Sequence, residues 1–129
     1  MKILFPQMRY NVYANLITLS DQEFLEDIYL HGGLEKLPYE PIDEAIHALF
    51  DDSGFDEGVE SQIGNILYSD HEALLIRELM NCLDAVQGKK EYFMIKSNAP
   101  YITDSDWPKV VAAAKAAKEE FERNGVEGI

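Results

Sequence analysis

Three residues at helical spacing could carry out chemistry together: Asp43, His47 and Asp51 recur every four residues. On a helix this spacing places two carboxylates and an imidazole along one flank. Such a set can bind zinc or act as an acid and a base. However, no second His and no Cys lies near them in the sequence, and an acidic helix produces this spacing by chance. We therefore expect a local ion pair around His47, with a metal-dependent enzyme as the alternative.

The acidic stretch from Asp51 to Glu60 has the composition of a calcium-binding loop but not its register. A loop that began at Asp51 would have Phe55 at the fifth ligand position, which must supply an oxygen. A loop that began at Asp52 would have Glu57 where the calcium loop requires glycine. The stretch is therefore expected to be a charged turn that binds no metal.

Nucleophilic chemistry is also not indicated. The single cysteine, Cys82, falls on a predicted apolar helix face with Leu79, Leu83 and Val86, where a thiol is a poor nucleophile. The sequence has no glycine-rich phosphate loop, nucleophile elbow or paired-cysteine motif. It therefore predicts a protein that is not an enzyme and has no cofactor.

Charge is distributed very unevenly along the chain. Between Asp21 and Glu72 there are fifteen Asp and Glu residues and one basic residue, Lys36, a net charge of -14, while the whole chain sums to -13. Like charges at this density repel one another, which favours a cationic partner. The same sign disfavours nucleic acid and anionic membrane surfaces as ligands.

No run approaches the roughly eighteen apolar residues of a membrane span, and the lone cysteine is typical of a reducing compartment. We expect a cytoplasmic protein.

The elements that must position these residues are predicted to be helices. A chain of 129 residues with 47% hydrophobic residues is expected to form one domain, residues 1–129. Apolar residues recur at helical spacing over about residues 6–19, 21–31, 42–50, 59–67, 70–86 and 107–124. The first stripe comprises Phe5, Met8, Val12, Leu16 and Leu19. The fold class is therefore all-α, or mainly α: a compact bundle of about five or six helices. One or two very short strands are possible, because Tyr92–Ile95 is β-prone.

Two helix starts have the spacing of a capping box. Ser20 precedes Glu23 by three residues, and Ser69 precedes Glu72 by three. In this motif each side chain accepts a hydrogen bond from a free amide of the first helical turn. We expect helices to begin at both places.

Several short motifs together resemble a family of small acidic bacterial proteins, some of which are similar to immunity proteins of contact-dependent growth inhibition systems. The motifs are Pro6-Gln7-Met8-Arg9, Leu49-Phe50-Asp51-Asp52-Ser53-Gly54, Ile63-Gly64 and Trp107-Pro108-Lys109-Val110-Val111. The resemblance implies a protein that binds a toxin domain and blocks it, and it supplies no catalytic residues. Within these motifs Arg9 is the only basic residue of the first helix, and we expect it to pair with Asp51 or Asp52.

The sequence thus predicts an immunity protein that neutralises a cationic toxin domain, in the first place a nuclease, through an acidic surface. The expected partner-binding residues are those of the most acidic helix and turn, with one tyrosine as an anchor: Tyr39, Asp43, Asp51, Asp52, Asp56, Glu57 and Glu60. Carboxylates would steer association, and the aromatic anchor would prolong it. Besides the metal-dependent enzyme, two alternatives are an acidic nucleic-acid mimic that regulates a host protein and a structural subunit whose acidic face provides solubility.

Overall fold

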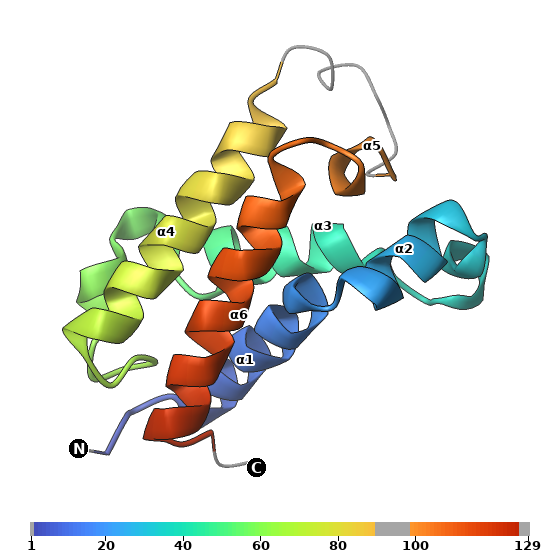
Figure 1. Cartoon of the computed structure of the whole chain (residues 1–129). Coiled ribbons are helices and arrows are strands. Elements are labelled where there is room, and N and C mark those ends of the chain that lie inside the picture. Colours follow the sequence, from blue (N-terminus) through green and yellow to red (C-terminus); the bar gives the residue numbers. More distant parts are fainter. Residues whose placement is uncertain (1, 90–98, 127–129) are drawn as a thin grey trace.

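The computed structural model describes residues 2–89 and 99–126, and these form an all-α fold (Figure 1). The predicted fold class is confirmed. Within the described ranges the only β-type pairing is an isolated bridge between Ile63 and Leu67, and no strand is present. The β-prone stretch Tyr92–Ile95 lies outside the described residues.

Six α-helices are described: α1 (Pro6–Ser20), α2 (Gln22–Leu30), α3 (Pro41–Ile46), α4 (Asp70–Gln87), α5 (Ala99–Ile102) and α6 (Trp107–Asn124). Shorter helical segments connect them: η1 (Gly33–Lys36), η2 (His47–Asp52), η3 (Phe55–Glu57) and η4 (Val59–Gln62). Three of these are 3₁₀ turns, whereas η2 is π-helical. The two long helices α4 and α6 have the bounds that apolar spacing predicts.

Helix α6 lies between α1 and α4 and packs against both (Figure 1). Its inner face combines small and large side chains: Ala114 and Ala117 are fully buried, as are Trp107 and Phe121. Because the alanines are short, the neighbouring helices can approach α6 closely along its middle. Leu16 of α1 fills the same core. These three helices form the scaffold, and the short segments η2 to η4 lie beside it.

Of the two predicted capping boxes, one forms in half and the other does not form. The Ser69 hydroxyl accepts a hydrogen bond from the Glu72 amide at 3.2 Å, as predicted. The Glu72 carboxylate accepts from the Tyr68 amide at 2.8 Å and not from the Ser69 amide. At α2 the predicted Ser20 cap is wrong, because Asp21 accepts from the Phe24 amide at 3.0 Å. The Ser20 hydroxyl donates instead to a carbonyl of its own helix, α1. Asp21 is the stronger acceptor, since its carboxylate is charged.

The predicted helix over 59–67 is wrong. Only the 3₁₀ turn η4 forms, and the amides of Asn65, Ile66 and Leu67 then converge on the Gln62 carbonyl at 2.9–3.1 Å. Gly64, at a φ of +94°, allows this tight reversal. Ile66 and Leu67 are buried all the same. The turn therefore buries the same apolar side chains that the helical spacing indicated.

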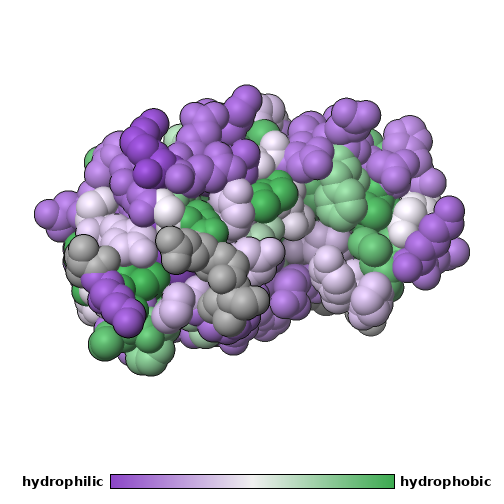
Figure 2. Space-filling view, turned by 90° about the horizontal axis from the view of Figure 1, so that it is seen from below, coloured by the Kyte–Doolittle hydropathy of each residue, from purple (hydrophilic) through white to green (hydrophobic). Residues whose placement is uncertain are grey.

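The surface is largely hydrophilic on the face shown in Figure 2, where hydrophobic residues emerge as separate patches. Among the described residues, the most exposed large hydrophobic side chains are Leu4 (69%) and Phe5 (54%). No helix among the described residues combines the length and the apolar character that crossing a bilayer would require.

Candidate functional site

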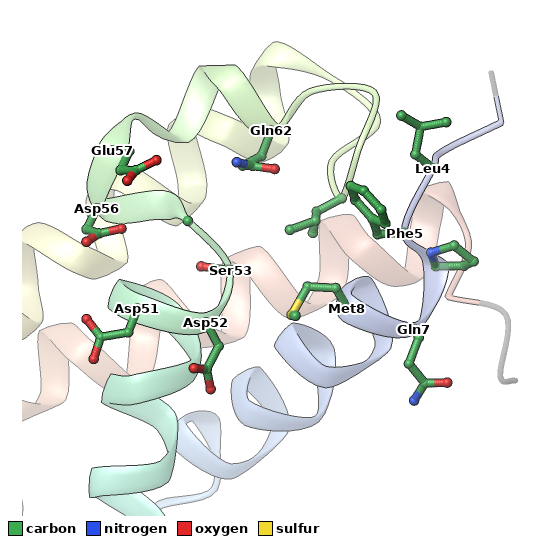
Figure 3. A pocket seen from close by; sticks show the side chains of 13 residues that line it. Leu4, Phe5, Gln7, Met8, Asp51, Asp52, Ser53, Asp56, Glu57 and Gln62 are labelled. Carbon is green, nitrogen blue, oxygen red and sulfur yellow. The ribbon is translucent and has the colours of Figure 1, made fainter.

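An open groove of about 890 Å³ lies between the start of α1 and the segment that joins η2 to η3 (Figure 3). One side of the groove, the acidic wall, carries four carboxylates: Asp51, Asp52, Asp56 and Glu57. The other side, the apolar wall, carries Leu4, Phe5 and Met8. Figure 3 shows the carboxylates on one side and Leu4 and Phe5 on the other, with Met8 between them. The groove therefore combines charge with apolar surface, which is typical of protein interfaces.

The π-helical segment η2 positions the first half of the acidic wall. The Ser53 amide donates to the Ala48 carbonyl, five residues back, at 3.2 Å. Ser53 is buried (4% exposed), and its hydroxyl donates to the Leu49 carbonyl at 2.9 Å and accepts from the Phe55 amide at 3.2 Å. Phe55 is also buried, in the core. The turn is thus held from inside while its carboxylates point to solvent. Single π-helical turns occur frequently at functional sites.

Gly54 makes the reversal that brings the two halves of the acidic wall together. Its φ is +76°, a left-handed conformation that residues with a Cβ rarely adopt. A Cβ at this position would also lie 3.0 Å from Gln62 Nε2. Glycine at this position therefore permits the turn after which η3 presents Asp56 and Glu57 beside Asp51 and Asp52 (Figure 3).

Backbone hydrogen bonds hold the apolar wall in place. The Leu4 amide donates to the Gly64 carbonyl at 3.0 Å, and the Phe5 amide donates to the Asn65 carbonyl at 2.8 Å. Pro6 then begins α1, where its fixed φ suits the first helical turn. The main chain is fixed, yet the Leu4 and Phe5 side chains remain more than half exposed. Apolar surface that is both exposed and positioned is a candidate contact surface.

The carboxylates of the acidic wall remain largely available for a partner. Within the part of the chain that the structure describes, Asp52, Asp56 and Glu57 take part in no ion pair. Asp51 is paired: its Oδ2 lies 3.0 Å from His47 Nδ1. This hydrogen bond raises the pKa of His47 above its ordinary value. The wall thus carries more carboxylates than paired cations among the described residues.

The structure brings together four of the seven predicted partner-binding residues and places the other three elsewhere. Glu60 forms an ion pair with Arg77 of α4 in a separate hollow. Asp43 lies in the first turn of α3, and Tyr39 lies in the loop before it, 49% exposed. None of the three lines the groove.

Sequence reasoning missed the apolar wall. Phe5 and Met8 fit the helical stripe that predicts the inner face of the first helix, but only Met8 is partly buried against the core. The signal that could have identified the wall is the Leu4-Phe5 pair directly before Pro6. Two adjacent large apolar residues outside a helix cannot both follow its inner face.

Asp43, His47 and Asp51 do not assemble into a metal site. His47 contacts Asp51, whereas Asp43 influences the pKa of His47 only through its charge. Over residues 2–89 and 99–126 no group of three or more His, Cys, Asp or Glu side chains is arranged to hold a metal ion. The ion pair around His47 that the sequence predicted is present.

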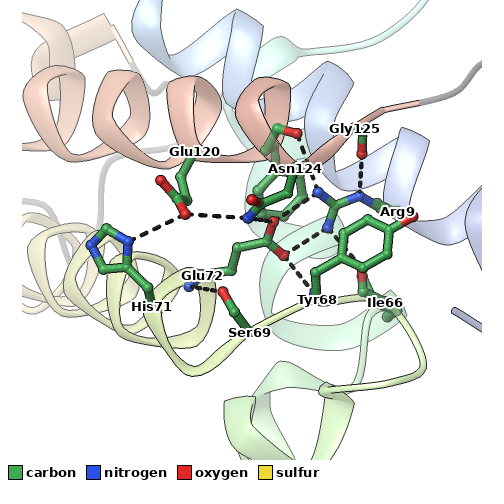
Figure 4. A network of polar contacts seen from close by, with 10 residues as sticks. Arg9, Ile66, Tyr68, Ser69, His71, Glu72, Glu120, Asn124 and Gly125 are labelled. Atoms are coloured by element: carbon green, nitrogen blue, oxygen red, sulfur yellow. Dashed lines mark hydrogen bonds and ion pairs between the residues drawn. The ribbon is translucent and has the colours of Figure 1, made fainter. Parts of the chain in front are cut away.

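A buried charge network supports the groove from behind (Figure 4). The Arg9 guanidinium donates to both Glu72 carboxylate oxygens, at 2.7 and 2.8 Å. It also donates to the Ile66 carbonyl at 3.0 Å and to the Gly125 carbonyl at 3.0 Å. Arg9 and Glu72 are 2% and 0% exposed. Since Ile66 lines the groove, Arg9 ties the back of the groove to α4 and to the end of α6.

The predicted pairing of Arg9 with Asp51 or Asp52 is therefore wrong. Arg9 precedes Val12 and Leu16 by three and seven residues, so it lies on the buried face of α1 and points between α4 and α6. Asp51 and Asp52 are exposed on the far side of the groove. The guanidinium also stacks on the ring of Phe121, 4.1 Å from the centroid, a contact available only inside the bundle.

The chain belongs to the family described as "Domain of unknown function (DUF7945)", which matches residues 3–128. The search of curated proteins and the search of solved structures gave no match. The family description names no activity.

Proposed function

We propose that this member of the DUF7945 family is an immunity protein that binds a cationic toxin domain, in the first place a nuclease, and blocks it in the cytoplasm. One observation carries the proposal: the groove places four carboxylates opposite exposed, positioned apolar side chains. This combination suits a basic protein surface. It offers nothing to phosphate, because the lining contains no basic side chain.

The charge of the chain explains how such a partner would be captured. A nuclease attracts phosphate with a basic cleft, so a protein with a net charge of -13 is drawn to that cleft. Electrostatic steering raises association rates to about 10⁸–10⁹ M⁻¹s⁻¹ at low salt. Charge thus provides speed and specificity, and the apolar wall provides residence time.

The sequence resemblance supports the same conclusion from another side. Two of the four motifs that resemble the family of small acidic bacterial proteins meet at the groove. They contribute Pro6, Gln7 and Met8 on one side and Asp51, Asp52, Ser53 and Gly54 on the other. Motifs far apart in the sequence therefore contribute to one surface, although the resemblance by itself assigned them no contact.

Protection against the toxin tests the proposal. Any toxin domain that the genome encodes next to this protein would be expressed in a sensitive bacterium with and without the protein, and growth would be measured. We expect the wild type to restore growth and to co-purify with the toxin domain. Neutralising the acidic wall (Asp52→Asn, Asp56→Asn and Glu57→Gln) should weaken protection.

The matched control removes the same charge elsewhere, by Glu23→Gln, Glu35→Gln and Glu44→Gln. These three residues are exposed and do not line the groove. This control should protect as the wild type does. A wild-type protein that neither protects nor binds the adjacent toxin domain would overturn the proposal. A genomic neighbourhood without a toxin gene would favour the nucleic-acid mimic.

A further inference from the structure

The two walls of the groove favour different groups of a ligand, and together they restrict which ligands can bind there. The acidic wall needs cations, because desolvating Asp52, Asp56 and Glu57 without partners is costly. The apolar wall needs apolar contact, because Leu4 and Phe5 lose water only against a nonpolar group. A ligand of one kind satisfies one wall and leaves the other uncompensated.

Other occupants fit the groove less well. Small-molecule sites enclose most of their ligand, whereas Leu4 and Phe5 stay 69% and 54% exposed at the edge of this groove. A second copy of the chain would bring another net charge of -13 against the same carboxylates. A purely basic polymer would contact the acidic wall alone.

We propose that the groove binds an amphipathic cationic segment of the partner protein, with Lys or Arg side chains against the acidic wall and a large apolar side chain against Leu4, Phe5 and Met8. The inference rests on the proposed function only for the identity of the protein that carries the segment. The chemistry of the segment follows from charge complementarity on one wall and apolar contact on the other.

Both walls are positioned before the segment binds. The buried Ser53 hydroxyl and the turn at Gly54 fix the acidic wall, and the hydrogen bonds to Gly64 and Asn65 fix the backbone of the apolar wall. A preorganised site loses little conformational entropy on binding. Therefore a short segment with the right pattern should be bound even when it is separated from its parent protein.

Peptide selection against the full-length protein tests the inference. Short random peptides displayed on phage would be selected on the immobilised chain at about physiological ionic strength. We expect enriched peptides that combine Lys or Arg with a large apolar residue. Synthetic versions should bind at least about tenfold more weakly to each wall variant than to the wild type.

The two wall variants separate the contributions. The first neutralises the acidic wall with Asp52→Asn, Asp56→Asn and Glu57→Gln. The second replaces the exposed part of the apolar wall with Leu4→Ser and Phe5→Ser. The matched controls are the Glu23, Glu35 and Glu44 triple variant and an Ile17→Ser, Leu74→Ser pair, whose side chains are 43% and 45% exposed outside the groove. Both controls should bind the peptides as the wild type does.

Four outcomes would overturn the inference. Peptides that carry only cations and bind the apolar-wall variant unchanged would make the groove a purely electrostatic surface. Peptides that bind both wall variants as tightly as the wild type would show that the groove is not the binding site. A selection that enriches no peptide would show the same. A wild-type dimer that dissociates in the wall variants would assign the groove to a second copy.

The result is separable from the test of protection. If the wild type protects against its toxin but the selected peptides bind both wall variants as tightly as the wild type, the inference fails and the proposed function stands. If both wall variants weaken peptide binding but no toxin is neutralised, the proposed function fails and the inference stands.

Discussion

The buried network around Arg9 and the acidic wall of the groove contain carboxylates from the same acidic stretch, yet they use them in opposite ways. Glu72 is 0% exposed and holds Arg9 with both oxygens. Asp52 is exposed, on a π-helical segment outside the bundle. A count of acidic residues therefore measures neither surface charge nor stability. The position of each acidic residue in the fold decides whether it contributes to surface charge or to stability.

The buried Arg9–Glu72 ion pair is tolerated because hydrogen bonds satisfy nearly all of its donors and acceptors. Burying two charges costs several kcal/mol per ion unless attraction and hydrogen bonds offset it. Arg9 donates to Glu72 and to carbonyls of three other residues. Glu72 accepts further hydrogen bonds from the Tyr68 amide and the Asn124 side chain, each at 2.8 Å. The network thereby joins α1, α4 and α6, and breaking it should affect the whole fold.

The largest effect is expected from Arg9→Met. The substitution keeps an apolar stem but leaves the Glu72 carboxylate buried without its cation. We expect the free energy of unfolding to fall by about 3–5 kcal/mol, measured by urea denaturation followed by circular dichroism. A loss below about 1 kcal/mol would show that water or a rearrangement compensates Glu72.

Two further variants show whether charge is the cause. Adding Glu72→Leu to Arg9→Met removes the uncompensated carboxylate, so the double variant should recover much of the lost stability. Arg77→Met breaks the exposed pair with Glu60, where solvent screens the charges, and should cost at most about 1 kcal/mol. A double variant as unstable as Arg9→Met alone would indicate packing instead of charge.

The sequence predicted elements better than partners. Apolar spacing identified α4 and α6, because long amphipathic helices are specified locally. It failed at 59–67, where Val59, Ile63 and Ile66 match helical spacing but Gly58 and Gly64 adopt positive φ and turn the chain. A turn and a helix can bury the same residues, and spacing alone does not separate them.

For a related reason, the acidic wall of the groove could be predicted from the sequence and the apolar wall could not. Asp51, Asp52, Asp56 and Glu57 are close in sequence, so their clustering is visible in the chain. The apolar wall depends on where Leu4 and Phe5 lie, and hydrogen bonds to Gly64 and Asn65, sixty residues away, decide this. The Arg9–Glu72 pair spans 63 residues and was missed for the same reason. Tertiary contacts at such separations leave no periodic signal.

The next effect in size concerns the turn that carries the acidic wall. Gly54→Ala forces an alanine into a left-handed conformation at a φ of +76°, which should cost about 1–2 kcal/mol of stability. Because the new Cβ meets Gln62 at the groove, the variant should also bind the selected peptides more weakly. Urea denaturation and peptide titration measure the two effects.

Gly32→Ala is the matched control for the turn. Gly32 has a φ of +80°, and a Cβ at this position would have no neighbour within 4 Å. The variant should lose similar stability while leaving peptide binding unchanged. Equal loss of peptide binding in both variants would mean that the Gly54 turn does not shape the groove.

A smaller effect is expected from neutralising the acidic wall without a ligand present. The Asp52, Asp56 and Glu57 variant should change the free energy of unfolding by about 0.5 kcal/mol or less, since these side chains are exposed and carry no ion pair within the described residues. Glu72→Gln neutralises one carboxylate of the buried network and should lower the free energy of unfolding far more. Urea denaturation of both variants compares them directly, and a wall variant that loses more than about 1 kcal/mol would give the wall a structural role.

The smallest effect tests how the acidic wall responds to pH. Asp51 raises the pKa of His47, with smaller contributions from the charges of Asp43 and Asp52. Protonated His47 is therefore favoured in the folded protein, and its interaction with Asp51 is fully present below the ordinary histidine pKa. The interaction is lost as the pH rises through the folded value. Above that value Asp51 faces a neutral imidazole, so a positive charge beside the acidic wall is lost and the wall should bind cationic peptides more tightly. An NMR titration of the His47 ring should show Asp51→Asn lowering its pKa towards the ordinary value, and Asp43→Asn lowering it less. An unchanged pKa in Asp51→Asn would detach His47 from the acidic wall.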